Sequence, residues 1–263
     1  MRKSLDFDRV GEILREAADT LVCPRFRRLD EAAISIKSHQ NDLVTIADLE
    51  AEIFLTRELT ALLPGSRALG EEAVYQDPSS KAVLDTDAPV WIIDPVDGTA
   101  NFARGSTAFG IIVALVRGRR TVAGWIYDPL QQRLFTAEAG AGTWSGGQRL
   151  TVAPRGGRGL DGLSGCISRR MAERHRAQFC TITQQGSAAH DYMALVDRRL
   201  DFRLFRLLNP WDHAAGVLMV EEAGGYVRLL SGTAYTPEFH ANDGLLIAPD
   251  VDTWDEIRVT LDI

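Results

Sequence analysis

Two aspartates three positions apart, Asp94 and Asp97, directly follow an apolar run of residues. The proline and glycine around them predict a tight turn, which can aim both carboxylates at one point. Two negative charges held this close raise the pKa of each carboxylate unless a cation compensates them. Mg²⁺ prefers oxygen ligands and usually keeps several waters, so a few carboxylates and the backbone carbonyl of Val96 would be enough to hold it. A magnesium site is therefore one prediction from this motif, and a simple turn is the other.

Other acidic residues strengthen this prediction, although each also has an explanation that needs no metal. Aspartate, proline and glycine are the residues that any tight turn uses. Glu71 and Glu72 are expected in a loop, where adjacent carboxylates are usually solvated. Asp212 lies in the expected first turn of a helix with Asn209 as its N-cap, a position that the helix dipole favours for a negative charge.

The spacing argues against two other acidic motifs. In aspartyl-phosphate hydrolases of the haloacid dehalogenase type, the nucleophile would fall two positions before Asp97, where this chain has Pro95. An EF-hand loop beginning at Asp94 would need oxygen ligands at Val96 and Gly98, its third and fifth positions. The sequence therefore indicates neither a covalent aspartyl nucleophile nor a calcium loop.

The composition limits the class of ligand. The chain has 263 residues, 45% of them hydrophobic and 25% charged, and a formal net charge of −7. This charge argues against a broad surface for nucleic acid or for an anionic membrane. No apolar run approaches the roughly 18–20 residues of a membrane span, and the N-terminus does not resemble a signal peptide. We therefore expect a cytoplasmic protein that binds a small ligand, with no nucleic-acid or membrane partner.

The elements that must position the acidic residues follow from the hydrophobic pattern. Apolar residues at intervals of three and four predict helices at residues 7–22 and 47–63, and a polar stretch at 77–88 predicts a loop. A strand at 89–93 carries the acidic motif. An antiparallel meander is expected to follow, with strands at 108–116, 121–127, 133–136 and 142–144.

The second half alternates short strands with helices. We expect strands at 162–168, 180–184 and 202–207 and helices at 169–179, 188–200 and 210–223. The glycine- and arginine-rich residues 154–159 mark a boundary. The sequence therefore predicts an α+β half, residues 1–154, with the metal motifs, and an α/β half, residues 155–263, that completes the site.

Several segments together resemble the inositol monophosphatase family. They are GEE at 70–72, WIIDPVDGTANF at 91–102 and WDHAAGVLMVEEAGG at 211–225, in the family's order and spacing, with Lys37 and DLVTIAD at 42–48 upstream. The resemblance implies a layered αβαβα sandwich, the sugar phosphatase fold shared with fructose-1,6-bisphosphatases. It further implies a homodimer that hydrolyses small phosphate monoesters with Mg²⁺, without a covalent intermediate, and is inhibited by Li⁺.

The resemblance also implies roles for individual residues. Glu71, Asp94 and the Val96 carbonyl would hold one Mg²⁺, and Asp94, Asp97 and Asp212 a second, so that the site takes two or three ions. The catalytic residues would be Glu71, Thr99 and Asp48, with Thr99 orienting the attacking water. The substrate-binding residues would be Gly98, Thr99 and Ala100 at a helix start, Gly186, Ser187 and Ala188 in a loop, and Asp212.

The resemblance leaves the substrate open. Inositol monophosphatases carry a glutamate for the ring hydroxyls shortly before the Trp-Asp pair, whereas residues 204–208 contain no acid. Arg206 is either a ligand for a second anionic group or a surface arginine on a strand. Inositol 1-phosphate, histidinol phosphate, adenosine 3′,5′-bisphosphate and fructose 1,6-bisphosphate all remain candidates. From another class, the alternative is a non-catalytic homologue that binds a metal or an anion.

Overall fold

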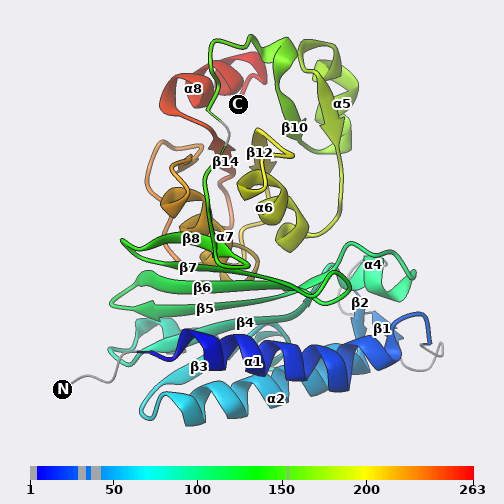
Figure 1. Ribbon diagram of the computed structural model, residues 1–263, viewed down its shortest axis with the longest axis vertical. Coiled ribbons are helices and arrows are strands. Elements are labelled where there is room, and N and C mark those ends of the chain that lie inside the picture. Colours follow the sequence, from blue (N-terminus) through cyan, green and yellow to red (C-terminus); the bar gives the residue numbers. More distant parts are fainter. Residues whose placement is uncertain (1–4, 29–33, 37–42, 153) are drawn as a thin grey trace.

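Helices and sheets alternate in five layers over the part of the chain that the structure describes (Figure 1). The structure is a computed structural model, and it describes residues 5–28, 34–36, 43–152 and 154–263. From one side to the other lie α1 and α2, a large sheet, α6 and α7, a small sheet, and α5 and α8. The helices are α1 (Phe7–Ala17), α2 (Ile46–Leu62), α5 (Arg169–His175), α6 (Ala188–Val196), α7 (Pro210–Glu222) and α8 (Val251–Thr260). This order confirms the predicted αβαβα sandwich.

The large sheet carries the acidic motif on its second strand. Its order follows the chain from β3 to β9, with β3 parallel to β4 and every later neighbour antiparallel, so the predicted meander is confirmed. Every residue of β4 is buried because helices cover both faces of the sheet. The strands are β3 (Arg67–Gly70), β4 (Val90–Asp97), β5 (Gly110–Arg117), β6 (Arg120–Asp128), β7 (Arg133–Glu138), β8 (Gly142–Ser145) and β9 (Gln148–Leu150).

The small sheet closes the second half of the chain. Its order is β11-β10-β12-β14-β13, in which β10 is parallel to both of its neighbours. Three of its strands lie where the sequence predicts strands, whereas β13, β14 and α8 were not predicted. The strands are β10 (Ser164–Cys166), β11 (Thr181–Thr183), β12 (Phe202–Phe205), β13 (Tyr226–Leu229) and β14 (Leu245–Ala248).

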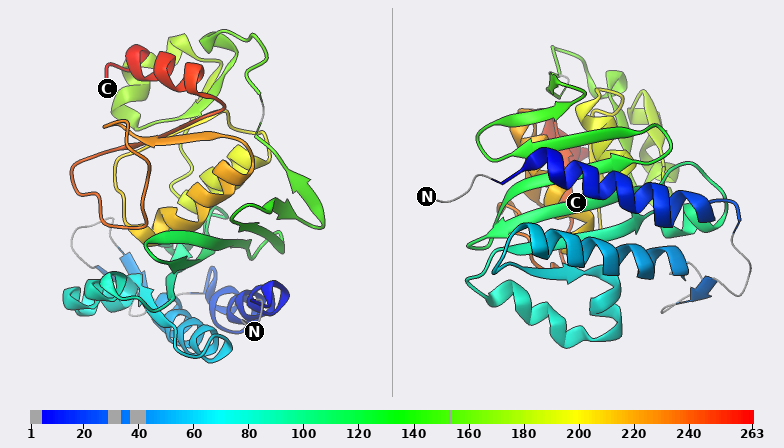
Figure 2. Two further views of the ribbon diagram at one scale, coloured as in Figure 1. Left: turned by 90° about the vertical axis from the view of Figure 1, so that its left-hand side faces the viewer. Right: turned by 60° about the horizontal axis from the view of Figure 1, so that its bottom comes forward.

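Helices α1 and α2 lie side by side across the outer face of the large sheet (Figure 2). The first helix was expected to run to residue 22, but α1 ends at Ala17 and continues as a π-helical turn, Ala18–Val22. A short antiparallel pair, β1 (Ile34–Ile36) and β2 (Leu43–Thr45), precedes α2. Lys37 and Asp42 of the family resemblance lie outside the described residues.

The stretch before β4 also differs from the prediction. Glu71 and Glu72, expected in a loop, open helix α3 (Glu71–Gln76), and much of the expected loop at 77–88 is a 3₁₀ helix, Pro78–Asp85. Six helical residues are too few to show a hydrophobic period, so the pattern could not separate this helix from a loop.

The expected boundary near residue 154 falls between the two sheets. Helices α6 and α7 belong to the second half, yet they pack on the large sheet, and both halves contribute to one hydrophobic core. A Cβ atom at Gly124 in β6 would lie 2.9 Å from the Cα atom of Ala215, so strand and helix backbones approach closely. The division into two domains stays a prediction. No helix among the described residues has both the length and the apolar composition of a membrane span.

Candidate metal centre

Three carboxylates from two elements converge at the end of β4. One ligand oxygen from each of Asp94, Asp97 and Asp212 lies within 4.8 Å of the others. Asp94 and Asp97 are 1% and 6% exposed, so these two charges are almost completely removed from water. Such a donor set, made only of hard oxygen atoms, suits Mg²⁺.

An irregularity in β4 brings the first two carboxylates together. In a regular strand, residues three positions apart point to opposite faces of the sheet. Here the register against β5 shifts between Asp94, which faces Ile112, and Asp97, which faces Gly110. The extra residue of this bulge rotates the strand, so that both side chains reach one point. The two aspartates therefore lie within the strand, not in a turn after it as expected.

The third carboxylate comes from the start of α7. Asn209 is the N-cap and Pro210 the first helical residue, as predicted, and Asp212 lies in the first turn. The Nδ2 atom of Asn209 donates a hydrogen bond of 3.2 Å to Asp212. Because α7 packs across β4, β5 and β6, its N-terminus delivers Asp212 to the other two aspartates.

The two buried aspartates of β4, Asp94 and Asp97, favour a nearby positive charge. Burial, and next the charge of Glu71, raise the pKa of Asp94 well above its usual range, and Asp97 and Asp212 add to this effect. Burial also raises the pKa of Asp97. Among the described residues, no lysine, arginine or histidine forms an ion pair with Asp94 or Asp97. A bound divalent cation would supply the missing positive charge.

Glu52 holds the start of α3, and with it Glu71, in place, a role that was not predicted from the sequence. The two carboxylate oxygens of Glu52 accept hydrogen bonds from the backbone N–H groups of Glu72 and Ala73, at 2.7 and 2.8 Å, at the start of α3. A Cβ atom at Gly70 would lie 2.1 Å from the carboxylate carbon of Glu52, so the glycine makes room for this cap. The first turn of α3 is thereby fixed beside β4.

Thr99 and Asp48 form a hydrogen-bonded pair beside the cluster. The Thr99 hydroxyl lies 3.0 Å from a carboxylate oxygen of Asp48 and 3.0 Å from the carbonyl oxygen of Val96. The other oxygen of Asp48 accepts a 2.9 Å hydrogen bond from the backbone N–H of Thr45, which caps α2. Burial is the main reason that the pKa of Asp48 is raised to about 6.

Gly98 allows the chain to pass from β4 directly into helix α4 (Thr99–Ala103). Its φ angle of 84° lies in the left-handed region, and a Cβ atom there would lie 2.8 Å from the carbonyl oxygen of Ala108. The predicted helix start at Gly98, Thr99 and Ala100 is therefore present, immediately after Asp97.

The loop that was expected to bind substrate also holds Asp97. Its carboxylate accepts hydrogen bonds from the Ser187 hydroxyl and from the backbone N–H groups of Ala188 and Ala189, at 3.1 and 2.8 Å. Asp97 thus caps the N-terminus of α6 as well as facing the cluster. The Nδ2 atom of Asn101 ties the same loop to α4 through a 2.7 Å hydrogen bond to the carbonyl oxygen of Gln185.

A cavity of about 400 Å³ opens beside the cluster. Asp97, Asp212 and the loop residues 186–188 line part of it, and residues 203–207 with Arg169 line another part. This volume suits a small ligand. Asp97 and Asp212 are the acidic residues in its lining, so the described wall offers no further carboxylate to bind sugar hydroxyls.

The metal-free protein is expected to lose stability as the pH rises from about 4 through about 6, and further above that because the pKa of Asp94 is raised well above its usual range. A carboxylate whose pKa is raised by folding binds its proton more tightly in the folded chain, so the folded state is penalised as that proton leaves. For Asp48 the pKa rises from 3.8 to about 6, and Asp94 and Asp97 shift in the same direction. Thermal unfolding in EDTA should give a lower Tm at the higher pH.

Added Mg²⁺ should raise the Tm most at the higher pH, where the carboxylates are ionised. Unrelated groups also titrate in this range, so an Asp94→Asn protein, measured in parallel, isolates the contribution of Asp94. A Tm in EDTA whose dependence on pH is the same for both proteins would contradict the prediction.

Comparison with known proteins shows extensive similarity. The model of a family described as the inositol monophosphatase family matches residues 4–260. An inositol-1-monophosphatase of Caulobacter vibrioides is 36% identical over 231 residues, 82% of this chain and 86% of that protein. A protein of Xylella fastidiosa named Nus factor SuhB is 34% identical over 204 residues, 73% and 70% of the two chains. The solved structure of an IMPase from Thermotoga maritima is 28% identical, covers 97% of this chain and 96% of that one, and has a TM-score of 0.82.

Proposed function

Because the chain belongs to the inositol monophosphatase family of phosphoric monoester hydrolases, we propose that it hydrolyses a small phosphate monoester with Mg²⁺. Water is the attacking group, and no covalent enzyme intermediate forms. The observation that supports this most is the convergence of Asp94, Asp97 and Asp212 within 4.8 Å beside a cavity of small-molecule size. Asp94 and Asp97 are buried and form no ion pair with a described lysine, arginine or histidine, which favours a cation at this place.

The proposed ligand set comes from the family resemblance, and the grouping of Asp94, Asp97 and Asp212 supports part of it. Glu71, Asp94 and the carbonyl oxygen of Val96 would hold one Mg²⁺, and Asp94, Asp97 and Asp212 a second, with Asp94 shared. The charges of Glu71, Asp97 and Asp212 all act on Asp94, which agrees with this central position. Bound Mg²⁺ supplies a water of lowered pKa and neutralises charge on the phosphoryl and leaving oxygens.

Thr99 orients the attacking water. Its hydroxyl proton is directed to Asp48 or to the carbonyl of Val96, so an oxygen lone pair remains to accept a hydrogen bond from the water. Asp48 is fixed by Thr45 and keeps Thr99 in this orientation. Glu71, whose charge acts on both Asp48 and Asp94, accepts the proton that the water loses.

The start of α4 and the loop before α6 bind different parts of the substrate. The N–H groups of Gly98, Thr99 and Ala100 at the start of α4, for which no described residue is an acceptor, bind the phosphate. Gly186, Ser187 and Ala188 line the cavity and, with Asp212, contact the alcohol portion. Because Ser187 and Ala188 also donate to Asp97, the alcohol site and the metal site share one framework.

Phosphate release from p-nitrophenyl phosphate tests the reaction class. We expect release with Mg²⁺ and none in EDTA, and we expect Li⁺ to inhibit it. A single turnover in H₂¹⁸O should place one ¹⁸O atom in the released phosphate, and acid quenching should trap no phosphorylated protein. Recovery of a phosphorylated protein after the acid quench would contradict direct attack by water on the substrate.

Absence of turnover with and without Mg²⁺ would favour the non-catalytic homologue that binds a metal or an anion. One relative, from Xylella fastidiosa, is named a Nus factor and not a phosphatase, so we keep this alternative. A homodimer and a cytoplasmic location also stay predictions, and sedimentation equilibrium tests the first. Inositol 1-phosphate, histidinol phosphate, adenosine 3′,5′-bisphosphate and fructose 1,6-bisphosphate form the substrate panel.

A further inference from the structure

The cavity beside the acidic cluster has a basic wall. Arg169, Arg203 and Arg206 all line it, and they come from the start of α5, from β12 and from the segment that follows β12. The acidic residues in the lining are Asp97 and Asp212, which the proposed function assigns to Mg²⁺. Once a divalent cation compensates those two charges, the rest of the wall attracts an anion.

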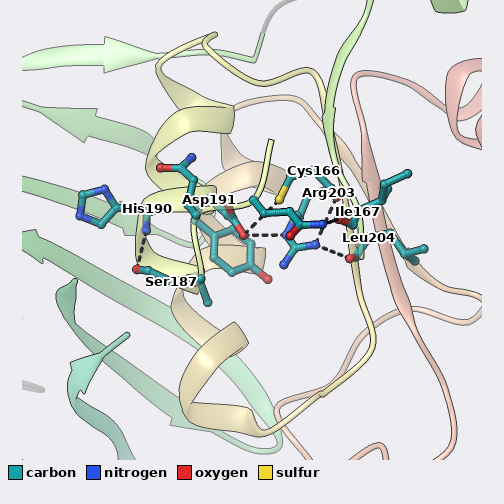
Figure 3. A network of polar contacts seen from close by, with 12 residues as sticks. Cys166, Ile167, Ser187, His190, Asp191, Arg203 and Leu204 are labelled. Atoms are coloured by element: carbon teal, nitrogen blue, oxygen red, sulfur yellow. Dashed lines mark hydrogen bonds and ion pairs between the residues drawn. The ribbon is translucent and has the colours of Figure 1, made fainter. Parts of the chain in front are cut away.

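Arg203 is held rigidly in this wall. Its Nε atom donates a 2.6 Å hydrogen bond to Asp191, and its Nη1 atom donates to the carbonyl oxygens of Cys166 and Leu204, at 3.1 and 2.5 Å. Its guanidinium carbon lies 4.1 Å from the ring centroid of Phe205. Figure 3 shows the side chains of Asp191 and Arg203 directed toward one another. These contacts fix the plane of the guanidinium group.

One edge of the Arg203 guanidinium remains available. The hydrogens on Nε and Nη1 are used by the contacts above, whereas no described residue accepts a hydrogen bond from Nη2. The Arg203 side chain is 17% exposed and lines the cavity. Nη2 can therefore donate two hydrogen bonds to a ligand there, and such a fork matches the oxygens of a phosphate or a carboxylate.

The partner of Arg203 is deeply buried. Asp191, in the first turn of α6, has no exposed surface, and its Oδ1 atom has no hydrogen-bond partner among the described residues. A buried ion pair of this kind contributes little net stability, because desolvation opposes the attraction between the charges. Its effect here is to orient a cation toward a ligand cavity.

Arg206 and Arg169 add charge at more exposed positions. Arg206 forms no ion pair with any residue that the structure describes, so its charge is free to act on a ligand. Arg169 pairs with Glu173 at 3.5 Å, but both side chains are largely exposed and such a pair is weak. The sequence alone left open whether Arg206 lies on an outer surface, and the structure places it in the cavity wall.

We propose that Arg203, Arg206 and Arg169 form a subsite for a second anionic group, a phosphate or a carboxylate, on the substrate. The inference rests on the proposed function, since the first phosphate is the one hydrolysed at the metal cluster. Arg203 is the fixed donor, and the two exposed arginines complete the charge. Among the four candidate substrates, the two bisphosphates carry such a group.

Matched pairs of compounds test the subsite. Fructose 1,6-bisphosphate is compared with fructose 1-phosphate for a second phosphate, and 3-phosphoglycerate with glycerol 3-phosphate for a carboxylate. The readout is the ratio of kcat/KM within each pair. We expect the wild type to favour the compound with the second anion in at least one pair by about tenfold or more, the worth of a charge-assisted hydrogen bond. The pair that shows the preference identifies the anion.

Variants then assign the preference to the arginines. Arg206→Gln and Arg169→Gln, at exposed positions that tolerate substitution, should each lower the ratio, and Arg203→Gln should lower it by about tenfold. Arg170→Gln is the matched control, because Arg170 is an exposed neighbour of Arg169 outside the cavity lining. Arg203→Gln leaves Asp191 without its partner, so its ratio is interpreted only if its Tm stays near that of the wild type.

Two outcomes would overturn the inference while the proposed function stands: equal kcat/KM within both pairs, or a preference that none of the three arginine variants reduces. Failure of the proposed function is distinguishable from both, because no compound would then release phosphate. In that case calorimetric binding of the same compounds tests the subsite. Equal affinity within both pairs would again contradict it.

Discussion

An Asp94→Asn protein is expected to lose Mg²⁺-dependent phosphate release by roughly 10³-fold or more, and to be more stable than the wild type in EDTA. The loss follows because Asp94 would contribute to both metal sites, and metal ions supply several kcal/mol of transition-state stabilisation. The gain follows because asparagine removes a buried negative charge that Glu71, Asp97 and Asp212 repel. The asparagine oxygen can still accept the 3.2 Å hydrogen bond from the N–H of Val96.

Initial rates at saturating Mg²⁺ measure the first effect, and thermal unfolding in EDTA at about pH 8 measures the second. For a chain of this size, each 1 kcal/mol of stability corresponds to about 2–4 °C in Tm. A core aspartate with a purely structural role would give the opposite second result, a lower Tm. Full activity in the variant would exclude Asp94 from the metal site.

Thr99→Val is expected to lower kcat by about 10²-fold or more with little change in KM. Valine has nearly the shape of threonine, so the start of α4 should persist, but the hydroxyl that would orient the water is lost. The hydroxyl is not expected to contribute to binding of the substrate in its ground state, so KM should change little. A change confined to kcat is the signature of an interaction made only in the transition state. Steady-state kinetics on p-nitrophenyl phosphate measures both constants.

Thr99→Ser is the matched control for this prediction. Serine keeps a hydroxyl that can donate to Asp48 or to the carbonyl of Val96, so most of the activity should return. Equal losses in Thr99→Ser and Thr99→Val would show that the threonine methyl group, not the hydroxyl, is what matters. A valine variant with wild-type kcat would remove Thr99 from the mechanism.

Much of the fold could be predicted from the sequence because its long elements have clear periods. The two N-terminal helices, the meander and α7 lie close to their expected positions. Two short elements beside the site, β3 and α3, were not predicted because they span too few residues to show a clear period. Tertiary contacts fix them instead, as Glu52 fixes α3.

The spacing of residues in the sequence predicted fewer of the site residues than the resemblance to the inositol monophosphatase family did. The spacing alone predicted that Asp94 and Asp97 lie close together. It predicted a turn between them, whereas the structure has a bulge in β4. Asp212, far away in the sequence, was assigned to the same site by resemblance, and the packing of α7 on the large sheet now brings it there.

The orientation of the Arg203 side chain could not be predicted from the sequence. Its partner Asp191 lies on a different element, and nothing in the spacing of a helix and the following strand specifies that the two side chains meet. A buried pair between two elements becomes visible only when the packing of both is known.

The double use of Asp97 has a consequence for how metal affinity can change. The carboxylate that faces the cluster also accepts three hydrogen bonds from the start of α6, so the hydroxyl of Ser187 competes for its electron density with any cation. The hydrogen bond from Ser187 and the binding of a cation both involve the carboxylate of Asp97, so the two are thermodynamically linked. Each weakens the other by the same factor. Position 187 is therefore a place where evolution or an engineer can adjust the metal requirement of the protein while every metal ligand stays unchanged.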